Sequence, residues 1–346
     1  MADRDDGATL TATIAQACAN GTATVIGGHG SKSFFTRDVE GELVSTVDHI
    51  GVLDYRPDEL VITTRSGMPL KDLASIVAAE NQMIPFDPPH FNGSGTVGGA
   101  LATGLSGPGR PWFGSVRDCV LGVEIVNGLG ERMNFGGQVI KNVAGYDISR
   151  LMVGSLGTLG LILSASIKVL PAADVSITVT ERCDARDAAE HVRAWMLKPY
   201  PITATCHVDG VLYLRLSGSG TSVAEARDAL GLEEGVEDVR FWAQVRDHEH
   251  AFFDTRVPLW RLSLPRGTYW SEGDCLTEWA GAQVWLKSDR EASDIHATAT
   301  QKGGYARRFG TVQPEQPATN DAIGKYTARL KEAFDPMGVL NPGLRF

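Results

Sequence analysis

The chain has 346 residues, a formal net charge of −10 at pH 7, and 43% hydrophobic and 21% charged residues. This composition is ordinary for a globular protein with two domains or one large one, and the negative charge disfavours nucleic acid and anionic membrane surfaces as partners. No apolar run reaches the roughly 18 residues of a membrane helix, and the acidic start MADRDDGATL lacks the apolar region of a secretory signal. We therefore expect a cytoplasmic protein with no nucleic-acid partner and no direct membrane insertion.

The five cysteines are scattered along the chain without a CxxC pair. An odd number without motif spacing indicates free thiols in a reducing compartment and argues against zinc or iron–sulfur ligation. We expect no metal site.

The first half of the sequence predicts a mixed α and β domain. Glycine is dense from Gly27 to Gly160 and thins after IKVLP, so we place a domain boundary near Pro171. In chain order we predict a helix ending over 14–19, strands over 23–28 and 58–67, and a helix over 68–81. A hairpin over 120–137 follows, with a tight turn at Asn127-Gly128. The domain ends with a short helix over 147–155, capped by Asp147, and a long strand within 157–170.

Three glycine-rich loops interrupt this domain at 26–33, 90–107 and 154–160. The second contains a GxGxxG pattern, but a dinucleotide-binding fingerprint needs a strand directly before it, and PFDPPHFN places three prolines there. Bare backbone still allows close approach and anion-binding turns, and Thr96 is suited to open a helix whose N-terminus attracts a negative group. Together the loops predict a long phosphate-containing ligand; the alternative is three ordinary tight turns.

The second half predicts alternating strands and helices. In chain order these are a strand over 173–181, a helix begun by Asp184, a hairpin across Asp209-Gly210, a helix over 222–231 with Ser222 and Glu225 as a capping box, and a strand over 236–245. The βαββαβ order is ferredoxin-like. Segments 258–264 and 282–288 and a helix near 289–301 suggest a second similar set, and the final LNPGLRF is expected to return to the first domain.

Three blocks carry a family resemblance: FDPPHFNGSGTVGGALATGLSGPGRPWFGSVRDCVLG, GGQVIKNVAGYDISRLMVGSLGTLGLILSASIKVLP and FDPMGVLNPGLRF. They resemble the PCMH-type FAD-binding domain of the vanillyl-alcohol-oxidase superfamily, and within it the FAD-binding E subunit of bacterial glycolate oxidase. The resemblance implies an α+β fold. A PCMH-type FAD-binding domain of two α+β subdomains would span 1–171, and a ferredoxin-like α+β cap domain 172–346, with a C-terminal tail that returns to the FAD domain.

The resemblance also implies which residues hold FAD between the two subdomains. They are Gly28, His29, Gly30, Ser31 and Lys32 in the first phosphate loop; Pro89, His90, Thr96, Val97, Gly98, Gly99, Gly104, Ser106 and Gly107 beside the diphosphate and isoalloxazine; Lys141, Asn142, Gly145 and Tyr146 flanking the flavin; and Gly157, Thr158, Leu159, Gly160 and Ile162 on the adenosine and ribityl side.

The first loop departs from that family, which usually has an arginine followed by glycines there. Some members of the superfamily attach the flavin covalently to a histidine, but their attachment site would fall at about Ser31 in this chain. We therefore interpret His29 as lining the pyrophosphate and predict non-covalent FAD.

No catalytic residue can be assigned from the sequence. Related dehydrogenases of 2-hydroxy acids carry a histidine-rich, metal-binding motif in the cap, whereas here DHEH (247–250) holds the only histidine pair. We interpret it as a solvated, partly helical segment. Arg261, Arg307 and Arg308 are candidates for binding a carboxylate; the alternative is that they are surface arginines at strand ends.

Three hypotheses follow. In the first, the chain is an FAD-binding subunit that takes part in oxidation of glycolate to glyoxylate, beside a homologous FAD-containing catalytic subunit and an iron–sulfur subunit. Such a complex would be cytoplasmic, with attachment to the inner face of the cell membrane through partner subunits as an alternative. In the second, the chain alone is an FAD-dependent dehydrogenase of a small 2-hydroxy acid. In the third, it is a non-catalytic flavin-domain scaffold.

Overall fold

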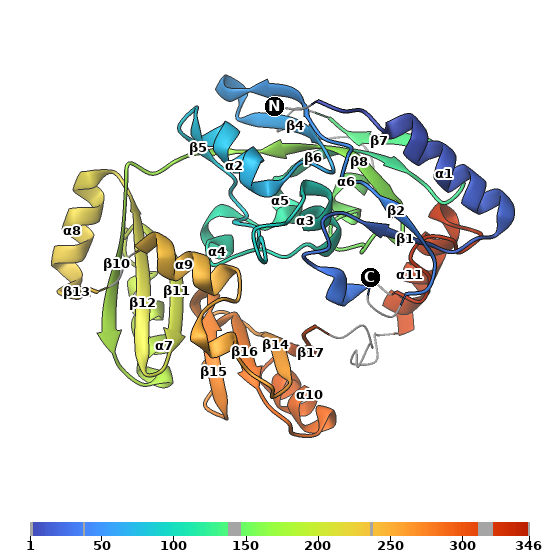
Figure 1. The fold of residues 1–346 in the computed structure, drawn as a ribbon. Coiled ribbons are helices and arrows are strands. Elements are labelled where there is room, and N and C mark those ends of the chain that lie inside the picture. The colour runs from blue at the N-terminus through green and yellow to red at the C-terminus, as the bar shows by residue number, and fades with distance from the viewer. Residues whose placement is uncertain (1–2, 37–38, 138–146, 236–237, 311–320, 345–346) are drawn as a thin grey trace. The chain divides into compact units, whose positions relative to one another are not determined.

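The computed structural model describes residues 3–36, 39–137, 147–235, 238–310 and 321–344 (Figure 1). The chain divides into two compact units. Unit 1 contains Met1–Ser106, Gly114–Ala172 and Ala318–Phe346, and unit 2 contains Gly107–Phe113 and Ala173–Pro317. The C-terminal segment therefore belongs to the same unit as the glycine-rich first half. None of the helices in the described ranges combines the length and apolar character needed to cross a membrane.

Unit 1 is built on a five-stranded antiparallel sheet. Its order is β3 (Val52–Arg56), β4 (Val61–Arg65), β8 (Leu161–Lys168), β6 (Val120–Val126) and β7 (Arg132–Gly136). The helices α2 (Leu70–Ala78), α3 (Val97–Thr103), α5 (Val116–Cys119) and α6 (Ile148–Leu151) share one core with the sheet. The central strand β8 is buried along nearly its whole length, and its sequence LILSASIK places two serines among apolar residues in that core.

A smaller layer of unit 1 holds the first glycine loop. Strand β1 (Thr24–Gly27) pairs in parallel with β2 (Glu42–Ser45), beside α1 (Gly7–Asn20). A second core joins Ile14 of α1, Val44 of β2 and Leu340 of the C-terminal tail, which follows α11 (Asp321–Phe334). The remaining short elements are β5 (Gln82–Met83) paired with β9 (Leu170–Pro171), and the 3-10 turns η1 (Ser33–Phe35) and η2 (Pro57–Glu59).

The predicted hairpin over 120–137 forms as β6 and β7, but its turn differs from the prediction. Residues 127–131 connect the strands in place of a tight Asn127-Gly128 turn. The side-chain oxygen of Asn127 accepts hydrogen bonds from the N–H groups of Leu129 and Glu131, and Gly130 takes the positive φ of 78°. An asparagine side chain that closes a turn in this way favours a longer loop over a two-residue one.

Unit 2 contains an eight-stranded sheet made of two similar sets. The first set is β10 (Val175–Arg182), α7 (Ala185–Trp195), β11 (Ile202–Val208), β12 (Val211–Gly218), α8 (Gly220–Leu230) and β13 (Glu233–Glu234). The second is β14 (Leu259–Ser263), β15 (Asp274–Glu278), β16 (Gln283–Lys287), α10 (Ala292–Gln301) and β17 (Tyr305–Arg308).

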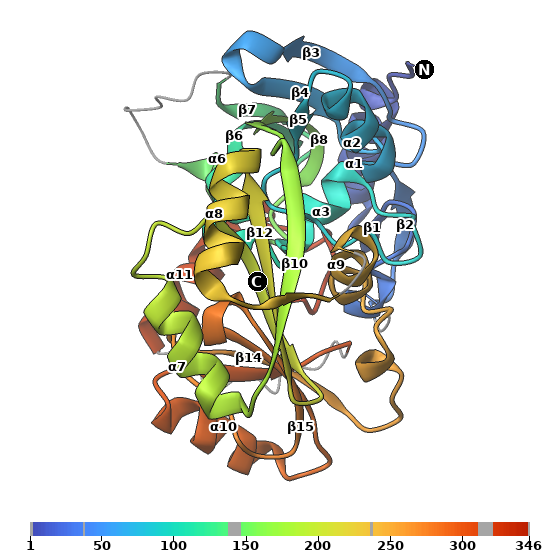
Figure 2. The same ribbon diagram turned by 90° about the vertical axis from the view of Figure 1, so that its left-hand side faces the viewer.

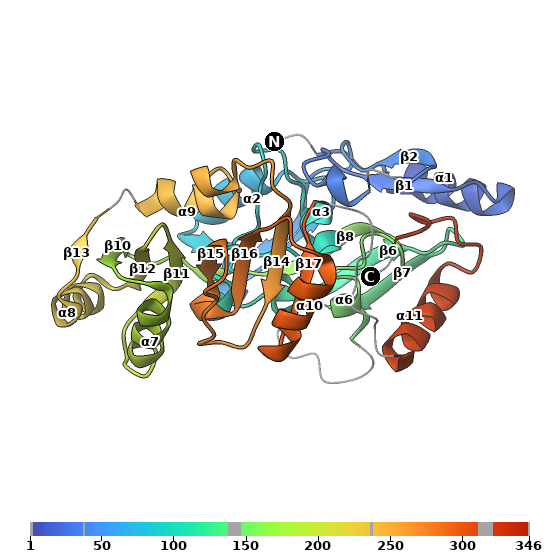
Figure 3. The same ribbon diagram turned by 90° about the horizontal axis from the view of Figure 1, so that it is seen from below.

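The sheet order shows how the two sets are related. It is β13-β10-β12-β11-β15-β16-β14-β17, so each set has the ferredoxin-like order of fourth, first, third and second strand, and the two second strands pair antiparallel. Figures 2 and 3 show α7, α8 and α10 on one face of this sheet and α9 (Asp238–Arg246) on the other. Shorter pieces are α4 (Arg110–Phe113), η3 (Ala251–Phe253) and η4 (Trp279–Gly281).

One predicted element of unit 2 is wrong, and another begins earlier than predicted. The described part of the segment predicted as a strand over 236–245 is the helix α9, and the fourth strand is the two-residue β13. Phe241, Trp242 and Val245 are spaced for one helical face, and they pack on β11, β15 and β16. Helix α8 starts at Gly220 with Ser219 as its cap, so Ser222 does not begin it; the side chain of Ser219 accepts from the N–H of Ser222.

Candidate cofactor site

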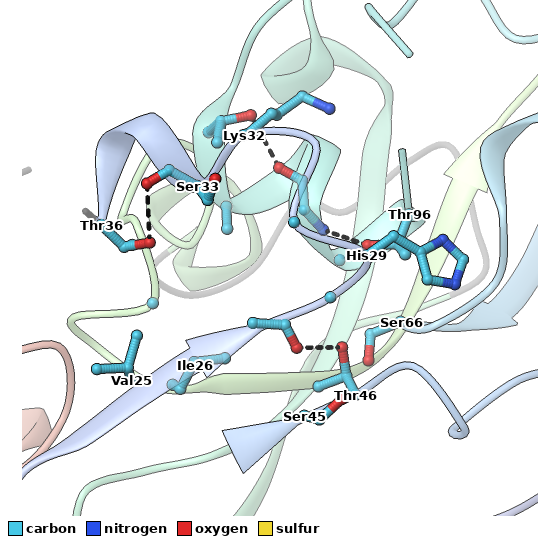
Figure 4. Close-up of a pocket in the computed structure, with 18 of the residues that line it drawn as sticks. Val25, Ile26, His29, Lys32, Ser33, Thr36, Ser45, Thr46, Ser66 and Thr96 are labelled. Carbon is cyan, nitrogen blue, oxygen red and sulfur yellow. Dashed lines mark hydrogen bonds between the residues drawn. The ribbon is translucent and has the colours of Figure 1, made fainter. Parts of the chain in front are cut away.

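Unit 1 contains a cavity of about 520 Å³, partly open to solvent, where its three glycine-rich segments meet (Figure 4). Residues of β1 and the loop after it, of β2, of α3, of the loop before β8 and of the C-terminal tail line it. This volume lies within the range of about 300–1,000 Å³ that is typical of small-molecule sites. Figure 4 shows Val25, Ser33 and Thr36 on one side of the cavity and His29, Ser66 and Thr96 on the other.

The first loop presents a row of unused backbone donors. The N–H groups of residues 28–31 donate to no acceptor in the part of the chain that the structure describes. Gly30 has a φ of 78°, and the loop closes through the N–H of Ser33 onto the carbonyl of Gly30. Lys32 is only 8% exposed, and its Nζ lies 5.3 Å from the centre of the Phe91 ring. Successive amides beside a buried ammonium form a concavity suited to a phosphate group.

The second loop contributes shape rather than backbone donors. Thr96 caps α3 as predicted, because its Oγ1 accepts from the N–H of Gly99 at 3.1 Å. The N–H groups of Val97 and Gly98 donate to the carbonyls of Met68 and Ser66. The first-turn amides of α3 are therefore already engaged, contrary to the expectation that this helix start would attract an anion.

Glycine is required where these segments touch. A Cβ on Gly28 would lie 2.7 Å from Thr96 Oγ1, and a Cβ on Gly98 would lie 2.8 Å from Ser66 Cβ. Both distances are shorter than any real carbon contact. The glycines thus let two loops and the end of β4 approach one another around the cavity.

The third loop is tied to the first by the C-terminal tail. Asn341 is 2% exposed; its Oδ1 accepts from the N–H of Ile26 at 2.8 Å, and its Nδ2 donates to the carbonyl of Leu156 at 2.6 Å. A Cβ on Gly157 would lie 2.8 Å from this Nδ2, and Gly157 has a φ of 72°. The tail therefore fixes the spacing of two loops that are far apart in sequence.

The structure gathers about half of the predicted cofactor residues in this cavity. Those that line it are Gly28, His29, Gly30, Ser31, Lys32, Thr96, Gly98, Gly99, Gly157, Gly160 and Ile162. Those outside its lining are Pro89, His90, Val97, Gly104, Ser106, Thr158 and Leu159, while Gly107 belongs to unit 2. Lys141, Asn142, Gly145 and Tyr146 lie outside the described residues. The side chains of Val97 and Leu159 are in the core.

The sequence missed a comparable number of lining residues. They are Val25, Ile26, Gly27, Ser33, Phe35, Thr36, Leu43, Ser45, Thr46, Val47, Ser66, Ala102, Thr103, Leu156 and Asn341. Most belong to β1, to the loop after it, or to the unpredicted strand β2 and the residues after that strand. Its sequence ELVS has two adjacent apolar residues and no alternation, so the burial of Val44 between exposed neighbours is visible only in the structure.

The chemistry of the lining fits FAD. Among the described lining residues none is acidic, although the whole chain is strongly negative. The buried hydroxyl of Ser66 has no hydrogen-bond partner among the described residues, and it sits in the lining. His29 Nδ1 lies 3.0 Å from the carbonyl of Ser94 and donates to it, which orients the ring. Apolar side chains such as Val25 and Leu156 complete walls suited to rings.

Comparison with known proteins agrees with this chemistry. Residues 5–136 match the family described as FAD binding domain. The chain is similar to the glycolate oxidase subunit GlcE of Escherichia coli (strain K12), with 42% identity over 332 residues. The match covers 95% of this chain and 94% of that protein. The chain belongs to the GlcE family. The resemblance expected from the sequence is thereby confirmed, and FAD is the cofactor of its matched domain.

Proteins outside the GlcE family are also similar to this chain. The glycolate oxidase subunit GlcD of Bacillus subtilis (strain 168) is 32% identical over 171 residues, which are 49% of this chain and 36% of that protein. Among solved structures, alkyldihydroxyacetonephosphate synthase matches with a TM-score of 0.66 at 16% identity, over 96% of this chain and 75% of that one. This structural match confirms the α+β, PCMH-type fold class.

Unit 2 of this GlcE-family chain does not present DHEH as a solvated segment, which corrects the sequence interpretation. The His248 ring stacks on Phe253 at 4.1 Å and meets Trp285 at 4.4 Å. Burial, assisted by the charge of Arg261, lowers the pKa of His248 to about 3, so the ring is neutral at physiological pH.

Three other groups in unit 2 come within metal-binding distance. Ligand atoms of Glu181, Cys183 and His191 lie within 4.8 Å of one another. Glu181 and His191 already pair at 2.9 Å, and burial together with nearby carboxylates raises the pKa of Cys183 to about 11. A protonated thiol beside an existing ion pair is a poor metal ligand, so we assign no metal there.

Proposed function

We propose that this chain binds one FAD non-covalently in the cavity of unit 1 and acts as the FAD-binding subunit of an enzyme that oxidises glycolate to glyoxylate. The observation that carries the proposal is the likeness to GlcE over nearly the whole of both chains. The unused donors of residues 28–31 support the placement of the cofactor, because they lie in a cavity within the segment that matches the FAD binding domain.

Each part of the cavity has a role in this proposal. The amides of residues 28–31 and the ammonium of Lys32 hold the diphosphate, and the hydroxyls of Ser66 and Thr96 donate to the cofactor. Asn341 keeps the first and third loops at the spacing that an extended dinucleotide needs. When bound, FAD supplies the two-electron acceptor that oxidation of an alcohol to a carbonyl requires.

The proposal includes partner subunits. GlcE and GlcD are both named as subunits of glycolate oxidase, and this chain is similar to each of them. We infer that it assembles with a homologous FAD-containing catalytic subunit and with an iron–sulfur subunit, and that these partners bring it to the inner face of the cell membrane. The iron–sulfur partner and the membrane location rest on the family resemblance alone.

The absorption spectrum of the purified full chain tests the cofactor. We expect a flavin spectrum with one FAD per chain, and acid precipitation should leave the yellow colour in the supernatant. A chain that neither purifies with FAD nor takes it up on titration would contradict the proposal. Colour in the protein pellet would overturn the non-covalent attachment.

Turnover of glycolate with an artificial electron acceptor tests the role as a subunit. We expect the isolated chain to turn over slowly or not at all, and activity to appear when it is expressed together with its partner subunits. Turnover by the isolated chain at the rate of the whole complex would favour the stand-alone dehydrogenase instead. Unchanged activity of the complex after deletion of this chain would exclude a contribution to the reaction.

A further inference from the structure

Unit 2 contains an arginine that is held in place but not neutralised. Arg261 lies in β14, and its Nε donates to Gln283 Oε1 at 2.8 Å. Its guanidinium carbon lies 5.5 Å from the centre of the Trp279 ring and 5.9 Å from that of Trp285. In the described part of unit 2, the two terminal nitrogens of Arg261 donate no hydrogen bond. The aromatic and amide contacts therefore orient the fork of donors without using it.

The residues that hold Arg261 form a connected chain of their own. Gln283 Nε2 donates to Glu278 Oε2 at 3.0 Å, and Trp285 Nε1 donates to the same oxygen at 2.8 Å. Glu278 and Gln283 are each 3% exposed. Buried polar groups that are hydrogen-bonded to one another in this way adopt a single arrangement. Glu278 therefore holds Gln283 in place, and Gln283 holds Arg261.

A second arginine faces Arg261 directly. In the antiparallel register of β14 and β17, Arg261 is opposite Arg307, so their Cβ atoms are about 5 Å apart on one face of the sheet. Arg307 is exposed, and within the described ranges neither arginine has an ion-pair partner. Like charges directly opposite each other destabilise a strand pair. Two unneutralised arginines at such a position are the arrangement expected of a site that an anion completes.

Charges of both signs surround Arg261, two of them arginines. The guanidinium carbon of Arg110 lies 4.5 Å from the centre of the Trp279 ring, on whose indole Arg261 also lies. Burial lowers the pKa of Arg261 to about 10; repulsion from Arg110 and Arg307 contributes, while Tyr305 and Glu278 oppose the shift without forming an ion pair with Arg261. Even so, Arg261 keeps its charge at physiological pH. The chain as a whole carries −10, so this cluster is a local exception to its electrostatics.

We propose that Arg261 and Arg307 form a binding site for a small carboxylate. A planar guanidinium whose terminal nitrogens are unused matches a carboxylate through two parallel N–H···O hydrogen bonds, and the second arginine neutralises the remaining charge. Tyr305, two residues before Arg307 on the same face, adds a phenol at the edge of the site. The ligand class is a 2-hydroxy monocarboxylate such as glycolate, a choice that rests on the proposed function; the anion site itself rests on the arginines.

Binding of oxalate and of glycolate to the purified full chain tests this site, with isothermal titration calorimetry and tryptophan fluorescence as readouts. Arg261→Gln and Arg307→Gln should each weaken binding about ten- to hundredfold, the effect of losing a hydrogen bond to a charged group. Arg261→Lys should recover only part of the affinity, because it keeps the charge and loses the fork. The indoles of Trp279 and Trp285 lie beside Arg261, so oxalate should change the fluorescence of the wild type.

Arg308→Gln is the matched control. Arg308 is an exposed arginine on the same strand, but it is opposite Trp260 and therefore on the other face of the sheet. This variant should bind oxalate like the wild type. Equal losses in Arg308→Gln and Arg307→Gln, or unchanged binding in both Arg261→Gln and Arg307→Gln, would overturn the site.

FAD content, measured on the same samples, separates this inference from the proposed function. A chain that carries FAD but does not bind oxalate or glycolate contradicts the carboxylate site and leaves the cofactor proposal standing. A chain that binds oxalate through Arg261 without holding FAD supports the site and contradicts the cofactor proposal. Arg307→Gln changes an exposed side chain, so its result stands even where Arg261→Gln fails to fold.

Discussion

Gly28 has no side chain at the point where two loops of the cofactor site meet. We predict that Gly28→Ala lowers FAD affinity by at least about tenfold. A methyl group there would push on Thr96 Oγ1 at 2.7 Å, and Thr96 can move only by giving up its cap on Gly99. Loss of such a cap costs about 1 kcal/mol by itself. Titration of the apoprotein with FAD, followed by flavin fluorescence, measures the change.

Gly27→Ala is the control for this argument. A Cβ on Gly27 would meet Leu43 Cδ1 at 3.1 Å, but Leu43 is 71% exposed and its side chain can rotate away. FAD affinity should stay within about twofold of the wild type, well under the 1.4 kcal/mol that a tenfold change requires. If both variants lose FAD to the same extent, the close contact between Gly28 and Thr96 is not the reason for glycine at that position.

His248 makes stability depend on pH in unit 2. Its pKa is about 3 in the folded chain and about 6.5 in an unfolded one. The folded state therefore favours the neutral ring, so the contribution is fully present above pH 6.5 and is lost as the pH falls toward 3. The free energy of unfolding should fall by at most about 1.4 kcal/mol per pH unit from this residue.

Urea unfolding at pH 7.0 and at pH 5.5 tests the sign and size of this effect. His248→Asn should show a smaller decrease between the two pH values, because asparagine does not titrate. Asparagine also tolerates the positive φ of 57° at this position. The comparison uses the slope with pH, so a uniform loss of stability from the missing ring contacts does not affect it. Equal slopes in the two proteins would contradict the burial of a neutral His248.

At the scale of elements, local signals in the sequence predicted local structure well. Thr96 and Asp184 cap their helices, and Asp209-Gly210 forms the predicted hairpin turn, with φ values of 51° and 70°. Each of these depends on residues within four positions of one another. Helix α9 was predicted as a strand because a short apolar run fits both periods, and only its packing on β11 and β15 decides between them.

The parts of the site that the sequence missed depend on long-range contacts. Asn341 bonds to Ile26, which is 315 positions away, and no local pattern announces such a partner. Ser66 follows β4 and becomes part of the lining only because Gly98 packs directly on it. The resemblance predicted the glycine loops because their sequences are distinctive. It gave no sign of β2, whose contribution to the cavity is mostly through ordinary side chains such as Leu43 and Val47.

Helix α11 fastens the C-terminal tail to the third loop through one lysine. Lys331 Nζ donates to the carbonyls of Thr158 and Leu340, each at 2.8 Å, and pairs with Asp335 at 2.6 Å. The Asp335 side chain is fully buried and also accepts from the N–H groups of Val339 and Leu340. Lys331→Met should cost about 3 kcal/mol, near the lower limit for breaking a buried pair, because Lys331 itself is 26% exposed.

Chemical denaturation and FAD content measure this effect together. Lys331→Met should also release FAD more easily, because Asn341 lies on the segment that loses its anchor. The double variant with Asp335→Asn should regain part of the lost stability, since it removes the uncompensated charge. Lys325→Met, an exposed position on the same helix, is the control and should resemble the wild type. A double variant that is no more stable than Lys331→Met would show that the charge on Asp335 is not what the lysine balances.

At the scale of the whole molecule, the cofactor site of unit 1 is assembled from both ends of the chain. Its lining runs from Val25 to Asn341, and the core beside it joins α1, β2, β8 and the tail. The net charge of −10 gives FAD no general attraction, so binding depends on this local assembly. A ligand that bridges segments so distant in sequence must stabilise them as one cooperative group.

Hydrogen exchange on the full chain, with and without saturating FAD, tests that cooperativity. We predict that FAD slows exchange together in residues 26–33, in 154–160 and in the tail 335–341, because Asn341 and Lys331 connect these segments. Helix α8 packs in a core formed only by residues of unit 2 and serves as the internal reference. At 100 times the dissociation constant, FAD should add about 2.7 kcal/mol to the opening free energy of the bound segments. Protection of the first loop without the tail would mean that the two ends of the chain do not act as one site.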